Sequence, residues 1–313
     1  MMINTITLNP AIDHILYLDS YKRNITNRLT GTAVTMGGKG THVAMNLSIM
    51  GETSRAYGFG YGRNGQIIID MLQEQGIIPR FIYDETFGES RDNYLIVERK
   101  TCDATLIADQ GPIPTTDHVN ALYTMIRDDA VFDELYALSG DASNFTDPYA
   151  YDTLMDILVS KKAKIFLDTS GKTLLSGIKH SPFLIKPNQV EMSLLVGKSL
   201  QTLPEMIDAI RFIDRNYQIY AVVISLGGDG SLSRIGDRLY RVKAPMVNVY
   251  NTVGCGDCMM AGMLYGFEHK YDPEDTLRFA TACSAATAES PLSVGFNFKR
   301  AKELMEQVDI SIQ

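Results

Sequence analysis

The sequence has little of what marks secreted, membrane-spanning or nucleic-acid-binding chains. Its 313 residues include only four cysteines (Cys102, Cys255, Cys258 and Cys283), too few for a disulfide scaffold in so long a chain. No stretch approaches the roughly 18 apolar residues of a membrane span, and the opening MMINTITLNPAID lacks the regions of a signal peptide. A net charge of −8 argues against nucleic acid or an acidic membrane as the main partner. We therefore expect a protein of a reduced cytoplasm whose partners are small molecules.

Other absences bear on organisation. Cys255 and Cys258 form a C-x-x-C pair, but no second pair or nearby histidine completes a zinc site. The chain has no internal repeat, no low-complexity tract and no Pro/Ser-rich linker. We therefore expect residues 1–313 to form one domain, which at this length has ample room for a buried core.

Strand-like runs alternate with helical ones along most of the chain. This alternation predicts an α/β fold with a parallel sheet covered by helices on both faces. Strands are expected at Ile3–Leu8, Lys164–Asp168, Phe183–Lys186 and Ala221–Leu226. Helices are expected at Thr41–Met50, Gln66–Gln75, Thr116–Asp128, Tyr149–Lys161, Pro204–Arg215, Gly254–Glu268 and Pro273–Glu289.

Two stretches break this rhythm. Ile15–Met36 and Arg91–Gln110 are extended, with polar alternation and no intervening helix. We expect these segments, at about residues 14–36 and 90–110, to form a small antiparallel flap, or lid, over one end of the sheet.

The most informative segment is Asn251–Asp257 (NTVGCGD), after which apolar residues follow at helical spacing. A helix that begins near Gly254 presents unpaired N–H groups and the positive end of its dipole, which suits an anion. Gly254 and Gly256 let the backbone approach a ligand, and Asp257 places a carboxylate in the first turn. Anion donors beside a fixed base are what phosphoryl transfer to a hydroxyl needs. The alternative is a glycine turn in which Asp257 only caps the helix.

Other glycine-rich segments indicate different chemistry. GYGRNG at Gly60–Gly65 matches G-x-G-x-x-G before a helix, with Asp84 about 20 residues on, which is typical of a nicotinamide-dependent oxidoreductase. Against it, Ser54–Phe59 is a poor candidate for a buried strand. Gly171–Thr173 (GKT) is no P-loop, because Phe166 stands where that pattern requires glycine. The oxidoreductase therefore stays open as an alternative function.

Five short motifs together resemble the PfkB family of carbohydrate kinases, in family order and over essentially the whole chain. They are Thr7–Asp13 (TLNPAID), Gly37–Gly40 (GGKG), Lys186–Glu191 (KPNQVE), Ser225–Gly230 (SLGGDG) and Asn251–Asp257. The resemblance implies a ribokinase-like three-layer α/β/α fold with a lid. It further implies ATP- and Mg²⁺-dependent phosphorylation of a ketohexose monophosphate to the bisphosphate, as in the branch of 1-phosphofructokinase and tagatose-6-phosphate kinase. Relatives of this kind often form homodimers through the lid.

The resemblance also implies roles for particular residues. Asp257 would be the general base, and the backbone amides of Gly254, Cys255 and Gly256 would hold the transferring phosphoryl group. Residues expected to bind the nucleotide are Lys186, Asn188, Glu191, Ser225, Gly227, Gly228, Gly230 and Thr252. Asn188 and Glu191 would also hold Mg²⁺ through its water shell, since this ion binds few protein carboxylates.

The residues expected to bind the sugar phosphate are Asp13, Gly37, Gly38, Lys39, His42, Arg91, Asn93 and Ser139. An acceptor-only carboxylate at Asp13 suits sugar hydroxyls. Lys39 and Arg91 are candidates for the phosphate already on the sugar, and an arginine fork matches a phosphate bidentately.

The chain also departs from the family pattern. His42 stands where relatives usually have asparagine, and it either donates to the ligand or is a helix-surface histidine without a role. After Gly140 the sequence DASNF (Asp141–Phe145) replaces the usual Ser-Leu-Pro, so a non-catalytic sugar-phosphate sensor is a further alternative. Thr26–Arg28 (TNR) and Gln110–Pro112 (QGP) favour tagatose 6-phosphate over fructose 1-phosphate.

Overall fold

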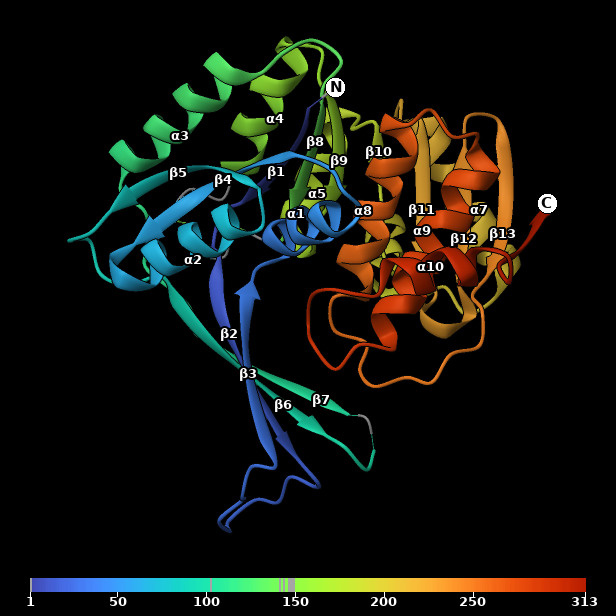
Figure 1. Cartoon of the computed structure of the whole chain (residues 1–313). Helices are drawn as coiled ribbons and strands as arrows, with labels where there is room; N and C mark the ends of the chain where they lie inside the picture. Colours follow the sequence, from blue (N-terminus) through green and yellow to red (C-terminus); the bar gives the residue numbers. More distant parts are fainter. Residues whose placement is uncertain (1, 102, 141, 143, 146–149) are drawn as a thin grey trace.

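The computed structural model describes residues 2–313 except 102, 141, 143 and 146–149. Its described residues form a ten-stranded sheet and a separate four-stranded sheet that projects from the body (Figure 1). The large sheet runs in the order β14-β13-β12-β11-β10-β9-β8-β1-β4-β5. Its strands are β1 (Ile3–Thr7), β4 (Ser54–Tyr61), β5 (Ile78–Asp84), β8 (Leu135–Ser139), β9 (Lys164–Asp168), β10 (Leu184–Ile185), β11 (Ala221–Ser225), β12 (Ser231–Ile235), β13 (Arg238–Lys243) and β14 (Asp309–Ile312).

Pairing is parallel from β11 to β5 and antiparallel from β11 to β14, so the expected mostly parallel sheet is confirmed. Strand residues alternate between two apolar cores, as a period of two requires. Val222 and Ile224 pack on one side of the sheet, whereas Ala221 and Val223 pack on the other. Helices therefore cover both faces, which confirms the three-layer prediction.

One face is covered by α3 (Thr116–Asp129), α4 (Ala150–Ser160), α5 (Gly171–Gly177), α6 (Gln189–Val196) and α7 (Leu203–Asn216). The other is covered by α1 (Lys39–Ile49), α8 (Cys255–Glu268), α9 (Pro273–Ala288) and α10 (Phe298–Met305), with α2 (Gly62–Glu74) packing beside α1. Short 3₁₀ turns occur at Ile178–His180 and Gly227–Asp229. None of the helices in the described part of the chain has the length and apolar character needed to cross a membrane.

Every predicted helix is present, with ends that coincide or differ by at most four residues, although Tyr149 lies outside the described residues. Two strand expectations need correction. Ser54–Phe59, taken as a poor buried strand, lies within β4 in the interior of the sheet. Its apolar residues are interrupted by serine, arginine and glycine, which hid the pattern. Conversely, β10 contains only two residues of the expected Phe183–Lys186.

The four-stranded sheet is the lid, built from β2 (Ala11–Leu18), β3 (Gly31–Gly37), β6 (Arg91–Glu98) and β7 (Ala104–Ala108) in the order β3-β2-β6-β7. Its central pair, β2 and β6, is parallel, so the expectation of a purely antiparallel flap was wrong. The reason lies in the large sheet. There β1 and β5 run parallel, and β2 and β6 leave their carboxyl ends in the same direction.

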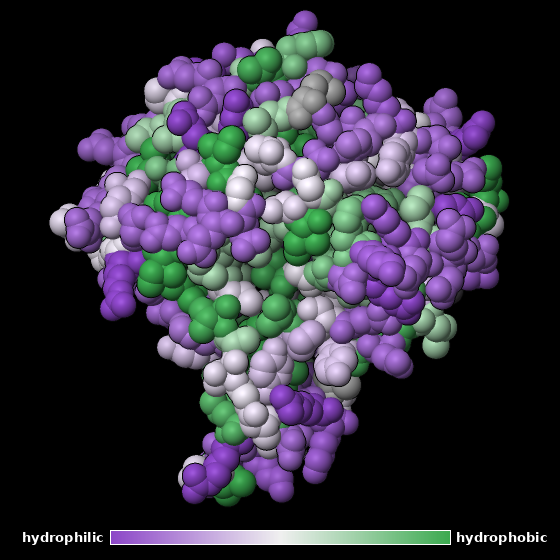
Figure 2. Space-filling model, viewed as in Figure 1, coloured by the Kyte–Doolittle hydropathy of each residue, from purple (hydrophilic) through white to green (hydrophobic). Residues whose placement is uncertain are grey.

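The lid strands align residues into rows that face opposite sides. Thr35, Asp13, Asn93 and Ala108 are in register across the four strands, and so are Val34, His14, Tyr94 and Ile107. The first row lies toward the body and the second on the opposite, more exposed face. Figure 2 shows the lid extending below a mainly hydrophilic body, with apolar side chains where the two meet.

Candidate active site

A cavity of about 630 Å³ lies between the lid and the carboxyl ends of the parallel strands. Ligands in open α/β sheets bind at this edge. The sequence-predicted residues that line the cavity are Asp13, Gly38, Lys39, His42, Arg91, Asn93, Ser139, Lys186, Asn188, Glu191, Ser225, Gly254, Gly256 and Asp257. Residues far apart in the sequence thus share one site.

The start of helix α8 forms one wall of this cavity. Gly254 is the N-cap at a φ of 80°, and a Cβ there would lie 1.9 Å from the carbonyl oxygen of Ser293. Only glycine fits this turn without displacing the loop behind it. No side chain of the described residues caps the helix, and Asp257 in its first turn is 7% exposed. The helix start therefore offers backbone donors beside a carboxylate, as predicted from NTVGCGD.

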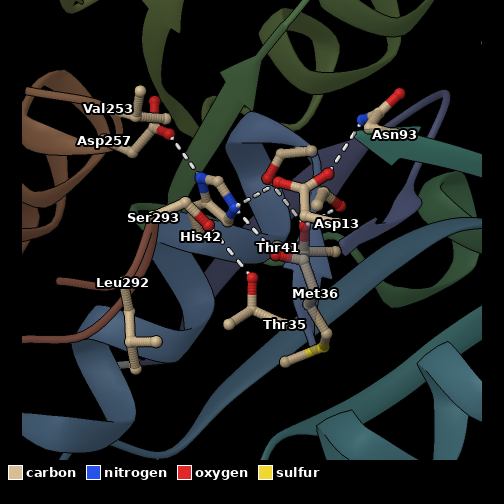
Figure 3. Close-up of polar contacts among 12 residues, drawn as sticks. Asp13, Thr35, Met36, Thr41, His42, Asn93, Val253, Asp257, Leu292 and Ser293 are labelled. Carbon is tan, nitrogen blue, oxygen red and sulfur yellow. Dashed lines mark hydrogen bonds and ion pairs between the residues drawn. The ribbon is translucent and has the colours of Figure 1, made fainter. Parts of the chain in front are cut away.

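His42 lies between two buried carboxylates (Figure 3). Its Nδ1 is 2.8 Å from Oδ2 of Asp257, and its Nε2 is 2.8 Å from the carbonyl oxygen of Met36 and 3.7 Å from Oδ2 of Asp13. The ring is only 5% exposed, so His42 is not the helix-surface histidine that was considered. Both ring nitrogens already have protein partners in this structure.

A second charged cluster joins the predicted lysines to Asp168, which the sequence analysis missed. Lys186 Nζ is 3.0 Å from Oδ2 of Asp168, and Lys39 Nζ is 3.6 Å from Oδ1. Burial alone would raise the pKa of Asp168, but the two ammonium groups lower it. The attraction of Asp168 outweighs burial and raises the pKa of Lys39 above its usual value. The ammonium groups of Lys39 and Lys186 thus line the cavity in their charged form, and they would attract an anionic ligand.

The lid contributes the other predicted sugar-side residues. Asn93 Nδ2 donates to Oδ1 of Asp13 at 2.8 Å, while Arg91 donates to the carbonyl oxygens of Asn9 and Asp109 at 3.1 and 3.3 Å. Gly37 does not line the cavity. It lies behind the Asp13 carboxylate, which leaves no room for a Cβ at that position because the nearest oxygen would be 2.0 Å away.

Ser139 ends β8 at the cavity wall. Its hydroxyl is buried and has no hydrogen-bond partner among the described residues. A buried hydroxyl without a partner costs free energy, so a ligand oxygen is a suitable partner. Of the nearby departure Asp141–Phe145, Asp141 and Ser143 lie outside the described residues, while Asn144 donates to the carbonyl oxygen of Pro112.

A smaller cavity of about 350 Å³ adjoins the first and shares Asn188, Ser225 and Gly256 with it. The apolar residues Pro245, Val247 and Met259 line this cavity. So do the remaining predicted nucleotide residues Gly227, Gly228, Gly230 and Thr252, and Cys255, whose backbone amide was predicted to hold the phosphoryl group. The predicted residues therefore divide between a charged cavity and a neighbouring, more apolar one.

Asn188 and Glu191 are engaged with each other at the start of α6. Asn188 Oδ1 accepts from the Glu191 amide at 2.9 Å, and Glu191 Oε2 accepts from the Asn188 amide at 2.8 Å, which is a capping box. The part of the chain that the structure describes holds no group of three or more His, Cys, Asp or Glu side chains arranged for a metal ion. These two residues have one unshared carboxylate oxygen, Oε1 of Glu191, to offer to a hydrated cation.

The Gly60–Gly65 segment does follow a strand and open a helix, yet its glycines serve internal packing. A Cβ on Gly65 would lie 2.4 Å from the backbone of Gly60, and the Asn64 amide at the start of α2 donates to Glu89. The carboxylate occupies the place that a pyrophosphate would need. No residue of this segment lines either cavity. The oxidoreductase alternative therefore loses its structural basis.

Asp168, Asn9 and Asp109 are among the cavity residues that sequence reasoning missed. Asp168 had a readable signal, because it closes the apolar strand KIFLD at its carboxyl end. Asn9 lies within the motif TLNPAID but was not singled out, and Asp109 had no signal of its own. Both accept from Arg91 through backbone carbonyl oxygens that only the packed lid brings close to it.

Comparison with known proteins agrees with this geometry. The model of the pfkB family carbohydrate kinases matches residues 6–296. The 1-phosphofructokinase of Escherichia coli K12 is 32% identical over 308 residues, 98% of this chain and 97% of that protein. The 1-phosphofructokinase of Bacillus subtilis 168 is 29% identical over 290 residues, 92% and 93% of the two chains. The structure of Escherichia coli phosphofructokinase-2 with substrates and products is similar in fold, with a TM-score of 0.92 at 21% identity over 98% and 99% of the chains.

Proposed function

Because the chain belongs to the pfkB family of carbohydrate kinases, it is an ATP-dependent phosphotransferase with an alcohol group as acceptor, and we propose that its acceptor is a ketohexose monophosphate. The expected ribokinase-like fold is confirmed by the same comparisons. One observation carries the proposal. A single cavity contains the carboxylate of Asp257, the start of helix α8 and the cationic side chains of Lys39, Arg91 and Lys186.

Among ketohexose monophosphates, fructose 1-phosphate has the better support. Both curated relatives are named 1-phosphofructokinase. The tagatose 6-phosphate preference rested partly on TNR, but Asn27 exchanges hydrogen bonds with the backbone of Lys22 at the lid tip and does not line the cavity. Gln110 does line it, so QGP remains compatible with either sugar.

We assign the chemistry to Asp257 and the helix start beside it. Asp257 would take the proton from the attacking hydroxyl, with the amides of Gly254, Cys255 and Gly256 stabilising charge on the phosphoryl group. Lys186 would stabilise the phosphate chain of the nucleotide, and Asp168 would hold its ammonium group and that of Lys39 in place. These groups are fixed before the ligands arrive, so little reorganisation accompanies transfer.

The second cavity suits the rest of the nucleotide. Its glycines at 227, 228 and 230 let the backbone come close, and its apolar side chains suit a base. Asn188 and Glu191 fit an outer-shell Mg²⁺, because one free carboxylate oxygen reaches a hydrated ion but does not form a cage. When bound, Mg²⁺ would neutralise charge on the nucleotide phosphates.

On the sugar side, Asp13 and Asn93 would receive hydroxyls, and Arg91 and Lys39 the sugar's phosphate. We further propose that residues 1–313 act as one domain in which the lid closes over the sugar and excludes water as a competing acceptor. The outer face of the lid, with its exposed row of Val34, Tyr94 and Ile107, would join two copies into a homodimer.

The test is ADP release measured with fructose 1-phosphate, tagatose 6-phosphate, fructose 6-phosphate and unphosphorylated fructose. We expect turnover with a ketohexose monophosphate and highest kcat/KM with fructose 1-phosphate. Binding of a sugar phosphate by calorimetry without any ADP release would instead support the sensor. Release with unphosphorylated fructose alone would reject a phosphate site at Arg91 and Lys39.

A further inference from the structure

His42 lines the proposed sugar cavity but has both ring nitrogens engaged inside the protein. Nδ1 contacts Asp257 Oδ2 at 2.8 Å, and Nε2 contacts the Met36 carbonyl oxygen at the same distance. With the ring 5% exposed and Asp257 7% exposed, water does not compete strongly for either bond. The ring is therefore unlike a ligand-facing histidine.

The identity of these partners fixes where the protons are. A carbonyl oxygen only accepts, so Nε2 must carry a hydrogen. In a neutral ring Nδ1 would carry no hydrogen. Two acceptors, Nδ1 and Oδ2 of Asp257, would then face each other unless Asp257 were protonated. The second carboxylate, Asp13, lies 3.7 Å from Nε2 and favours the charged ring. The arrangement is therefore an imidazolium held between two carboxylates.

We propose that His42 is a positioning residue whose doubly protonated ring fixes Oδ2 of Asp257 and links it to Asp13, leaving Oδ1 of Asp257 for the acceptor hydroxyl. The inference rests on the proposed kinase function. When Oδ2 of Asp257 is held by the ring, only Oδ1 is left to accept the proton of the hydroxyl. The link through His42 also sets the distance between Asp257 and Asp13, the carboxylate that would hold the sugar.

The residues around His42 keep its ring charged near neutral pH. Burial alone would lower the pKa of His42, but hydrogen bonds and charges from Asp13 and Asp257 raise it to about 10. Asp13 comes from β2 and Asp257 from α8, while Lys39, earlier on α1, interacts with Asp257. The two carboxylates thus outweigh burial.

The ring state is tested on the resting enzyme by long-range ¹H–¹⁵N correlation spectra. The chain has five histidines, and the His42 signals are assigned by their loss in His42→Asn. We expect both nitrogens of His42 to remain protonated from pH 6 to pH 9. A ring that becomes neutral near pH 6.5 would overturn the proposal, whether or not any sugar phosphate is turned over.

The positioning role is tested with two variants. In His42→Asn the amide nitrogen takes about the place of Nδ1, so a neutral donor to Asp257 remains, whereas His42→Leu removes the donor and keeps the bulk. We expect kcat of His42→Leu to fall roughly 10- to 100-fold with little change in KM for ATP. We expect kcat of the parent enzyme to fall as pH rises towards 10, where the His42 ring loses its proton. We expect His42→Asn to keep most of the parent's kcat at pH 7 and not to show this fall.

If His42→Leu does not fold, the pH profile of His42→Asn and the spectra of the parent enzyme still test the positioning role. Wild-type kcat and an unchanged pH profile in folded His42→Asn and His42→Leu would reject the role. Failure of the whole substrate panel with the parent enzyme would reject the kinase function separately, because the protonation of the resting ring needs no substrate.

Discussion

At the scale of single residues, the buried carboxylates of the site are each paired with a hydrogen-bond donor or a cation. Asp257 contacts His42, Asp168 contacts two lysines, and Asp13 contacts Asn93. Buried carboxylates are tolerated because cations or donors compensate the loss of water. Single substitutions in this set therefore have separable effects on turnover, binding and stability.

Asp257→Asn is expected to lower kcat by roughly 10²–10⁴, the range for a lost general base. ATP binding should stay near the parent value, because the amides and Lys186 are untouched. Steady-state kinetics and nucleotide calorimetry measure the two quantities. Asp275→Asn, in the first turn of α9, is the matched control and should change neither. Near-normal kcat in Asp257→Asn would remove this residue from the chemistry.

Arg91→Ala is expected to raise KM for the sugar phosphate roughly 10- to 100-fold, since a charge-assisted hydrogen bond contributes about 1.5–3 kcal/mol. The KM for ATP should change much less. Arg91→Lys keeps the charge but loses the fork, so its KM for the sugar phosphate should lie between those of the parent enzyme and Arg91→Ala. Equal changes in both KM values would place Arg91 outside the sugar-phosphate site.

His42 gives a pH dependence of stability with a definite sign. Its pKa is raised to about 10 in the folded chain from an ordinary 6.5, through Asp13 and Asp257 acting against burial. Its stabilisation is therefore complete below pH 6.5 and is lost as pH rises towards 10. Urea unfolding should show the largest difference between the parent and His42→Asn at pH 6, and a shrinking difference at pH 7, 8 and 9. A constant difference would contradict the raised pKa.

At the scale of elements, site geometry depends on how strands and helices end. Strands β8, β9 and β11 place Ser139, Asp168 and Ser225 at one sheet edge, and α8 begins there at Gly254. The loop before α8 packs against residues 290–293, with Asn251 donating to the carbonyl oxygens of Ser290 and Leu292. The start of α8 is thus fixed by tertiary contacts as well as by its own sequence.

Gly254→Ala tests this element. The added Cβ would meet the Ser293 carbonyl oxygen at 1.9 Å, and φ is positive. We expect a loss of more than about 2 kcal/mol in the free energy of unfolding, together with a loss of turnover. Gly51→Ala, at a φ of 90° with open space around it, is the control and should cost about 1 kcal/mol without affecting turnover. Equal losses in both variants would show that backbone strain alone explains the effect.

At the scale of the whole molecule, the lid presents two different faces. The row containing Asp13 and Asn93 faces the cavity, whereas Val34, Tyr94 and Ile107 are 55%, 44% and 54% exposed on the other face. Exposed apolar rows on a sheet are suited to burial against a second copy.

We therefore expect the 34.8 kDa chain to run as a dimer in light scattering, and Val34→Glu to shift it towards monomer. A charge placed in a buried apolar contact is costly, which is the reason for the shift. Val190→Glu alters a residue that is 78% exposed on α6, away from the lid, and should leave the dimer intact. A parent protein that is monomeric at micromolar concentration would exclude the lid interface.

The layered fold, the helices and most of the residues that line the main cavity could be inferred from the amino-acid sequence. Helical periodicity and glycine-flanked helix starts are local signals, and the order of motifs such as KPNQVE and NTVGCGD indicated the family. Both kinds of pattern are visible in short stretches of sequence, so they can be recognised without knowing which distant residues are in contact.

Other features of the site depend on contacts between residues that are far apart in the chain. The glycines of Gly60–Gly65 proved to serve packing, the central lid strands proved parallel, and Asp168 joined Lys39 to Lys186. His42 lies 215 positions from Asp257 in the chain, and their contact forms only when α1 packs against α8. Burial and charge pairing depend on such distant neighbours, so the protonation of this site could not be inferred before the fold was known.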